Sequence, residues 1–306
     1  MPQKVLVALD GSPEAEESIP WARALADPEQ IVLLQVVKRG ASDSIHLIHT
    51  DHAARDARRY LQQVAKERLP GASTETRLGS VASAILLLAE ELDARLIVVT
   101  RRGAGGMGKA LLGGTTENLI HAAERPILVV PVREEGPLAG TRIGSVVVPL
   151  DGSEASESVL PLARSVGRRT GATVTLLHVL PDSLGLEEDL ELLRESGLES
   201  ETIRAMITKV EAEGERRKAR LREAAEGLVR AGVRAETRLL SGKPETEIAK
   251  FVRKEAADMI LMSAHGYGAV GRLLLGSVAC KLIGTAKVPV LVTQRAAVPE
   301  IQGSLK

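Results

Sequence analysis

A glycine-rich stretch in the second half of the chain could bind an anion. The stretch SAHGYGAVGRLLLGS, residues 263–277, has four glycines and directly follows the apolar run DMILM. Glycine costs stability inside a regular element, so this cluster indicates a backbone that something must approach closely. Bare amides that lead into a helix can wrap phosphate oxygens, and Arg272 and Ser277 could add a charge and a hydroxyl. We therefore expect phosphates between Gly266 and Ser277, with His265 in reach of phosphate or ribose.

An Asp-Gly-Ser turn follows the first apolar run of each half of the chain. Asp10 comes after VLVAL, and Asp151 comes after VVVPL. A carboxylate repels phosphate, but it can accept hydrogen bonds from an adenine amino group or a ribose hydroxyl. We therefore predict a nucleoside near Asp151. The alternative is a purely structural aspartate that forms the turn and starts the next helix, and both uses can coexist.

The spacing of these features shows that the chain repeats its own pattern. Asp151 stands 141 positions after Asp10, and Gly242 stands 163 positions after Gly79, an offset that then stays constant. Such a repeat over nearly the whole chain predicts two copies of one domain. We place domain 1 at residues 1–132 and domain 2 at residues 144–295, with a linker at 132–144.

Each copy alternates strand-like and helix-like segments. The Val, Ile and Leu runs are typical of strands buried on both faces of a parallel sheet, and the helical stretches between them indicate right-handed crossovers. The predicted fold is α/β, with two tandem doubly wound five-stranded parallel-sheet domains. Ligands of such folds bind at the carboxyl ends of the strands, where both the turns and the glycine loops fall. In the first half we expect strands at 5–9, 31–37, 74–78, 95–100 and 126–132, a helix opened by Ser12 and Pro13, and helices at 51–69, at 81–92 and ending near 123.

The second half carries about 20 extra residues before Gly242, which we interpret as an additional helical flap over the carboxyl edge of the sheet. The charged stretch within it indicates a long amphipathic helix with a solvated face.

Composition narrows the classes of partner. The formal net charge is zero, which argues against nucleic acid or an anionic membrane surface. Aromatic residues make up 1% of the chain, so stacking platforms for bases are nearly excluded and a bound base would lie between aliphatic groups. The single cysteine, Cys280, fits a reduced cytoplasmic setting, and we expect it to be a small core residue. We expect no signal peptide and no membrane span.

The glycine loop and the segments around it resemble those of the universal stress protein family. The family pattern G-x2-G-x9-G-[ST] appears here as Ser263-x2-Gly266-x9-Gly276-Ser277, and VVVPLDGS, LLLGSVA and VPVLVT are also similar to family segments. The resemblance implies a tandem protein with domains of the adenine nucleotide alpha-hydrolase-like type. It implies that ATP or AMP binds with adenine at Asp151 and Val179, and that the fifth strands of the two domains pair as an internal pseudo-dimer. The predicted site also includes Leu150 and Val278.

The first half departs further from that pattern. It reads Thr100-x2-Gly103-x9-Gly113-Gly114, so the terminal hydroxyl is missing and Thr115 follows one place later. The nucleoside end is kept by Asp10 and Val36, and two arginines at 101 and 102 keep positive charge nearby. Binding in domain 1 stays open at this point.

The leading hypothesis is a cytoplasmic, homodimeric regulatory protein of the stress response that binds ATP or AMP, with Mg²⁺ or Mn²⁺ on the phosphates as an option. No general base or activated nucleophile is apparent, so a dedicated enzyme is not expected. A slow ATPase or phosphotransferase and a nucleotide-independent interaction scaffold are the alternatives. His46, His49 and His52 could lie on one helix face and bind a metal, although the second half has no counterpart. We interpret His178 as a structural residue.

Overall fold

The computed structural model describes residues 3–38, 44–101, 114–132, 141–180, 200–264 and 275–294. Both predicted glycine loops therefore fall largely outside the described residues. The inserted segment 181–199 and most of the linker also lie outside them.

Domain 1 follows the expected alternation of strands and helices. Its strands consist of aliphatic runs because branched side chains fit a pleated surface that is covered on both faces. The elements are β1 (Val5–Leu9), η1 (Ala15–Glu17), α1 (Ser18–Leu25), η2 (Pro28–Gln30), β2 (Ile31–Val37), α2 (Ser44–Arg68), β3 (Ser73–Leu78), α3 (Val81–Glu91), β4 (Leu96–Arg101), α4 (Gly114–Ala122) and β5 (Ile127–Pro131).

Domain 2 repeats this order and adds a longer second crossover helix. Its elements are β6 (Ser145–Pro149), α5 (Glu154–Glu157), α6 (Leu160–Thr170), β7 (Thr173–Leu180), α8 (Ser200–Arg230), β8 (Ala235–Ser241), α9 (Pro244–Lys254), β9 (Met259–Ser263), α10 (Ser277–Thr285) and β10 (Val290–Thr293).

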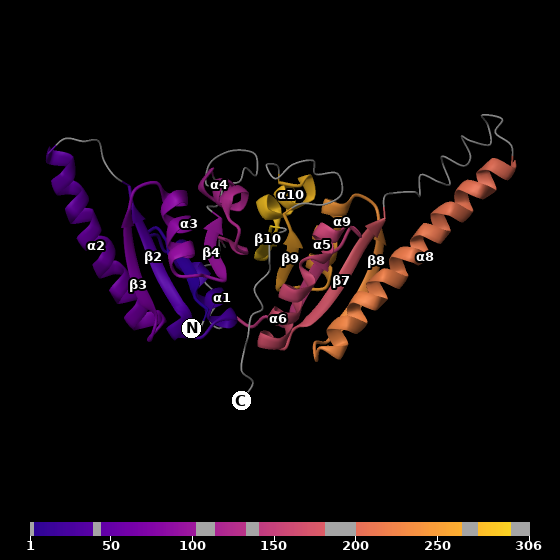
Figure 1. Ribbon diagram of the computed structural model, residues 1–306, viewed down its shortest axis with the longest axis horizontal. Helices are drawn as coiled ribbons and strands as arrows, with labels where there is room; N and C mark the ends of the chain where they lie inside the picture. Colours follow the sequence, from indigo (N-terminus) through magenta and orange to yellow (C-terminus); the bar gives the residue numbers. More distant parts are fainter. Residues whose placement is uncertain are drawn as a thin grey trace.

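The strands of both domains form one ten-stranded sheet in the order β3-β2-β1-β4-β5-β10-β9-β6-β7-β8. Within each domain the neighbouring strands are parallel, which confirms the doubly wound fold. The domains meet where β5 pairs antiparallel with β10, with Leu128 opposite Leu291. This confirms the pairing of the fifth strands, and Figure 1 shows the two halves side by side across that junction.

Helices cover both faces of the sheet and enclose two hydrophobic cores. One core cluster lies under α1, α2, α6 and α8, and the other lies under α3, α4, α9 and α10. Each cluster contains residues of both domains, so the apolar interior continues across the domain junction. Burial of this surface is the main favourable term for holding the domains together.

Several predicted boundaries differ from those of the structure. The first helix does not open directly after Ser12; a turn and η1 come first, and α1 begins at Ser18. Ser12 still caps this segment, because its Oγ accepts a hydrogen bond from the amide of Ala15 at 3.2 Å. The helix expected from residue 51 begins at Ser44, since the sequence there has no Gly or Pro that would stop it.

The charged helix of domain 2 is confirmed as α8, a helix of 31 residues. Its buried side chains Leu221, Ala225 and Leu228 recur at helical spacing and pack into the core with α6 and β7. In Figure 1, α8 lies beside β8 and its first turns extend past the strand. Within the described residues, then, the insertion lengthens a helix that packs on one face of the sheet.

The core assignment of Cys280 was wrong. Its side chain is exposed. On α10 the buried stripe consists of Ala279, Leu282 and Ile283, at spacings of three and four residues, and Cys280 lies off that stripe.

Candidate functional site

The Asp-Gly-Ser turn of domain 2 is held by its own side chains. Oδ1 of Asp151 accepts hydrogen bonds from the amide of Ser153 at 2.9 Å and from its Oγ at 2.6 Å. Ser153 in turn caps α5, because its Oγ accepts the amide of Ser156 at 3.1 Å. Gly152 between them has a φ of +81°, which favours glycine. The structural use of the aspartate is thus confirmed, and its orientation is set before any ligand binds.

Domain 1 builds the same turn at Asp10. Its Oδ1 accepts the amide of Ser12 at 3.0 Å, and Gly11 has a φ of +86°. The carboxylate is exposed, whereas that of Asp151 is partly buried. Both turns therefore present an ordered carboxylate at the carboxyl end of the first strand of their domain.

Two arginines of α8 donate hydrogen bonds to the backbone of the Asp-Gly-Ser turn of domain 2. Nη1 of Arg217 donates to the carbonyl oxygen of Asp151 at 2.8 Å, and Nη1 of Arg220 donates to that of Gly152 at 3.2 Å. Nη2 of Arg220 also lies 3.5 Å from Oε1 of Glu157 on α5. Only a small cavity remains between α8 and the turn. Sequence reasoning missed this pair, because the charged stretch reads as a solvated helix face until the helix is docked.

The ends of the second strands carry the residues expected near adenine. Val36 and Val179 are half-buried and pack against the core cluster under α3, α4, α9 and α10. His178 points to the opposite face, where Nδ1 lies 2.6 Å from the carbonyl oxygen of Leu150. Both His178 and Leu150 are buried, so the structural assignment of His178 is confirmed.

The helix α10 begins directly beside the end of β9. The amide of Gly276 donates to the carbonyl oxygen of Ala264 at 2.8 Å, which ties the two ends of the glycine loop together. Gly276 is the N-cap residue of α10, Ser277 opens the helix with an exposed side chain, and Val278 packs half-buried against the same core cluster as Val179. The buried Ser263, in the position of the first pattern glycine, ends β9 opposite Thr293.

Topology brings these pieces together. β6 lies between β7 and β9 in the sheet, so the ends of these strands place Asp151, Val179 and Ser263 along one edge. The chain leaves β6 toward β7 and later returns to β9 on the other side. This is the switch point at which parallel sheets bind ligands.

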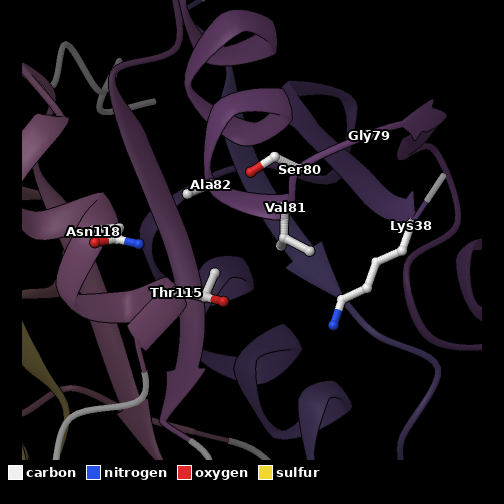
Figure 2. Close-up of a pocket in the computed structure, with 7 residues that line it drawn as sticks. All are labelled: Lys38, Gly79, Ser80, Val81, Ala82, Thr115 and Asn118. Carbon is white, nitrogen blue, oxygen red and sulfur yellow. The ribbon is translucent and has the colours of Figure 1, made fainter. Parts of the chain in front are cut away.

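Thr115 of domain 1 lies in a hollow of about 430 Å³ between α3 and α4. Lys38, Ser80 and Asn118 also line it, and Figure 2 shows Lys38 on the opposite side of the hollow from Thr115 and Asn118. Thr100, by contrast, is the next-to-last residue of β4, is half-buried, and is not among the lining residues. The sequence analysis named Thr115 but not its three polar neighbours, which come from segments far apart in the chain.

Arg101 at the end of β4 contacts domain 2. Its guanidinium donates to the carbonyl oxygens of Ile283 and Ala286 at the end of α10 in domain 2. Burial lowers the pKa of this group. The pairing of β5 with β10 brings this helix end within reach of Arg101, which the sequence analysis had considered only as positive charge near the first glycine loop.

The remaining predicted residues lie outside the described part of the chain: Gly103, Gly113, His265, Gly266, Arg272 and Arg102. The side chains of His46 and His49 lie outside it as well, although the helix that carries them is described. Among the described side chains, no group of three His, Cys, Asp or Glu residues could hold a metal ion.

The comparison with known proteins agrees with this architecture. The sequence model of the universal stress protein family matches residues 1–131 and again residues 143–294. The chain belongs to the universal stress protein family. A universal stress protein of Mycolicibacterium smegmatis is 27% identical over 304 residues, which cover 95% of this chain and 96% of that protein. A tandem relative of Mycobacterium tuberculosis is 24% identical over 95% of this chain and 96% of its own length.

A solved universal stress protein of Archaeoglobus fulgidus has the same fold. It superposes with a TM-score of 0.70 at 21% identity, covering 97% of this chain and 100% of that chain. A second solved structure, of a protein from Pseudomonas aeruginosa, gives a TM-score of 0.60 at 17% identity over 95% of this chain. Both likenesses extend over the two universal stress protein domains.

None of the described helices is long and apolar enough to cross a membrane.

Proposed function

We propose that this universal stress protein binds an adenine nucleotide, ATP or AMP, at the carboxyl edge of domain 2 and acts as a regulatory protein of the stress response. The observation that carries the proposal is the bond between Gly276 and Ala264, which sets the start of α10 beside the strand end next to Asp151. An ordered carboxylate and a helix start at one switch point match the two ends of a nucleotide, a hydrogen-bonding nucleoside and an anionic phosphate.

The described residues fit such a ligand. Val179 and Val278 offer half-buried aliphatic surface for a base, as the scarcity of aromatic residues requires. The first turn of α10 has no capping side chain, so its amides can donate to phosphate, and the exposed Ser277 adds a hydroxyl. Mg²⁺ or Mn²⁺ would come with the phosphates.

The scaffold alternative loses support from the sheet itself. It relied on the edge of the fifth strands, and that edge is used within the chain where β5 pairs with β10. Homodimer formation and a cytoplasmic location stay predictions from the sequence.

Substitution at the start of α10 tests the proposal. Protein purified without added nucleotide is denatured, and the supernatant is compared with AMP, ADP and ATP standards on an anion-exchange column. ATP and AMP are then titrated into wild type and Ser277→Ala by calorimetry. Loss of a hydroxyl that donates to a charged phosphate should raise the dissociation constant about tenfold or more.

The matched control is Thr285→Ala, at the opposite end of the same helix, where the exposed hydroxyl donates to the carbonyl oxygen of Lys281. Thr285→Ala should leave the affinity for ATP and AMP unchanged. Folded wild-type protein that binds neither ATP nor AMP at millimolar concentration would refute the proposal.

A further inference from the structure

A cavity of about 520 Å³ lies at the junction of the two domains. Domain 1 contributes Trp21 of α1 and Pro131 at the end of β5, and domain 2 contributes the ends of α9 and α10 and the starts of β9 and β10. Neither Asp-Gly-Ser turn lines it, and nor does Ser277 at the start of α10. Its volume and its position between domains are typical of small-molecule sites.

The walls of this junction cavity are mainly apolar. Val252, Val288 and Ile260 provide branched aliphatic surface, and four alanines and two prolines add to it. Trp21, the single tryptophan of the chain, also lines the cavity and is 8% exposed. Such walls favour a ligand with an apolar body, because its burial removes hydrocarbon surface from water.

Two cations accompany the apolar walls. Arg253 and Lys287 line the cavity and are exposed, and within the described part of the chain neither side chain forms an ion pair. Asp258 is the one acidic residue of the lining, and its Oδ2 accepts the amides of Gly144 at 2.7 Å and Ser145 at 2.9 Å. The lining side chains thus carry a net charge of +1, which a single anionic group would neutralise.

The equivalent residues of domain 1 carry the opposite charge. The bounds of α3 and α4 differ from those of α9 and α10 by a constant 163 positions, so the two helix pairs correspond residue for residue. By this offset Arg253 corresponds to Glu90, and Lys287 corresponds to Glu124. The two cations therefore belong to domain 2 and are not a general feature of the fold.

An ion pair in domain 1 also becomes apolar surface in domain 2. Nη2 of Arg125 lies 2.9 Å from Oδ1 of Asp93, and the corresponding residues Val288 and Ala256 both line the junction cavity. Asp93 and Ala256 share the same backbone conformation, with a φ of +47°. The difference between the domains at this place is thus one of side chains, and it exchanges a charged pair for a hydrocarbon wall.

We propose that the junction cavity binds a small carboxylic acid with an apolar body. Arg253 and Lys287 are the counter-charges of the carboxylate, and the body lies against Val252, Val288 and Trp21. The apolar walls favour such an acid over a highly charged phosphate compound, which would lose more hydration on entering them. This site goes beyond the proposed function, because it lies at the other end of α10 from the nucleotide site.

Trp21 provides the measurement, because tryptophan emission of this chain comes from that residue alone. Octanoate is titrated into the full chain while Trp21 emission and binding heat are followed. Octanol and octylammonium are the matched compounds, with the same chain and a neutral or a positive head group. Octanoate should bind one site per chain, about threefold more tightly than octanol, and octylammonium should bind more weakly than octanol. Hexanoate, with two methylene groups fewer, should bind about tenfold more weakly than octanoate.

Two kinds of variant separate the head group from the walls. Arg253→Gln and Lys287→Gln should each weaken octanoate binding about threefold and leave octanol binding unchanged. The double variant Ala256→Asp/Val288→Arg installs the ion pair of domain 1 and should weaken both compounds about tenfold, as if two methylene groups were no longer buried. The control is Lys254→Gln, an exposed lysine beside Arg253 that does not line the cavity and should behave as wild type. Thermal unfolding verifies that each variant is folded.

Octanoate binding without a change in Trp21 emission would place the acid elsewhere and overturn the inference. Octanol that binds as tightly as octanoate would also overturn it, and so would octanoate binding that is equal in wild type, Lys287→Gln and the double variant. Ser277→Ala should leave octanoate binding unchanged. Loss of ATP and AMP binding with octanoate binding intact would count against the proposed function alone, and the reverse result would count against this inference alone.

Discussion

Arg101 at the end of β4 donates a hydrogen bond to the carbonyl oxygen of Ala286 at 3.2 Å, across the junction between the domains. The same guanidinium binds the carbonyl oxygen of Ile283, so it caps the end of α10. The other end of α10 carries Gly276 and Ser277. One side chain thus connects the strand that leads into the first glycine loop with the helix that opens at the proposed nucleotide site.

We predict that Arg101→Met lowers the free energy of unfolding by about 1.5–3 kcal/mol, the usual value of hydrogen bonds to a charged group. Urea unfolding of wild type and variant measures this loss. Arg125→Met is the control, since it removes a partly exposed ion pair with Asp93 inside domain 1 and should cost less than about 1 kcal/mol. Equal losses of unfolding free energy in the two variants would show that Arg101 stabilises the protein no more than a surface ion pair does.

A second cross-domain contact should make stability depend on pH. Nη2 of Arg169 on α6 donates to Oδ1 of Asp27 at 2.6 Å, and this hydrogen bond lowers the pKa of Asp27. The folded protein then binds the proton more weakly than the unfolded chain. The pair therefore contributes at pH values above the ordinary carboxyl pKa, and its contribution is lost as the pH falls through the lowered pKa.

Asp27→Asn should consequently destabilise the protein at neutral pH by less than about 1 kcal/mol, because the Asp27 side chain is 59% exposed. The measurement is the difference in unfolding free energy between wild type and variant, at neutral and at strongly acidic pH. The difference should shrink in acid and in high salt. A difference that persists in acid would mean that Asp27 acts through packing instead of charge.

Gly152→Ala should damage the turn that carries Asp151 in two ways. The residue has a φ of +81°, and an added Cβ would lie 1.7 Å from Nη1 of Arg217. The matched control is Gly171→Ala, with a φ of +69° and no atom within 4 Å of the added Cβ. The control should lose about 1–2 kcal/mol from backbone strain alone, and Gly152→Ala should lose more.

Urea unfolding and an AMP titration check this prediction, with weaker AMP binding expected in Gly152→Ala only. Adding Arg217→Ala to Gly152→Ala should relieve the clash but not the strain. If both glycine variants lose the same stability, the contact from α8 does not constrain the turn.

Much of the fold was readable from local pattern. The strands β1 and β2 have the predicted bounds, since continuous aliphatic runs between turn residues carry that information within a few positions. The repeat predicted two equivalent domains, and the constant offset of 163 reappears in the helix bounds. The turn chemistry of Asp10 and Asp151 was also predictable, because an aspartate bonds to residues only two positions away.

The contacts that distinguish the two domains required the tertiary structure. Arg101 and Arg102 are adjacent arginines in the sequence, and only the pairing of β5 with β10 shows that Arg101 caps a helix 182 positions away. The docking of α8 likewise turned Arg217 from a solvated charge into a partner of the Asp151 backbone. The hollow lined by Lys38, Ser80 and Asn118 is formed by segments that are far apart in the chain. Helical and strand periodicity act between near neighbours, whereas these contacts form between segments that approach one another only after the sheet and both helix layers have assembled.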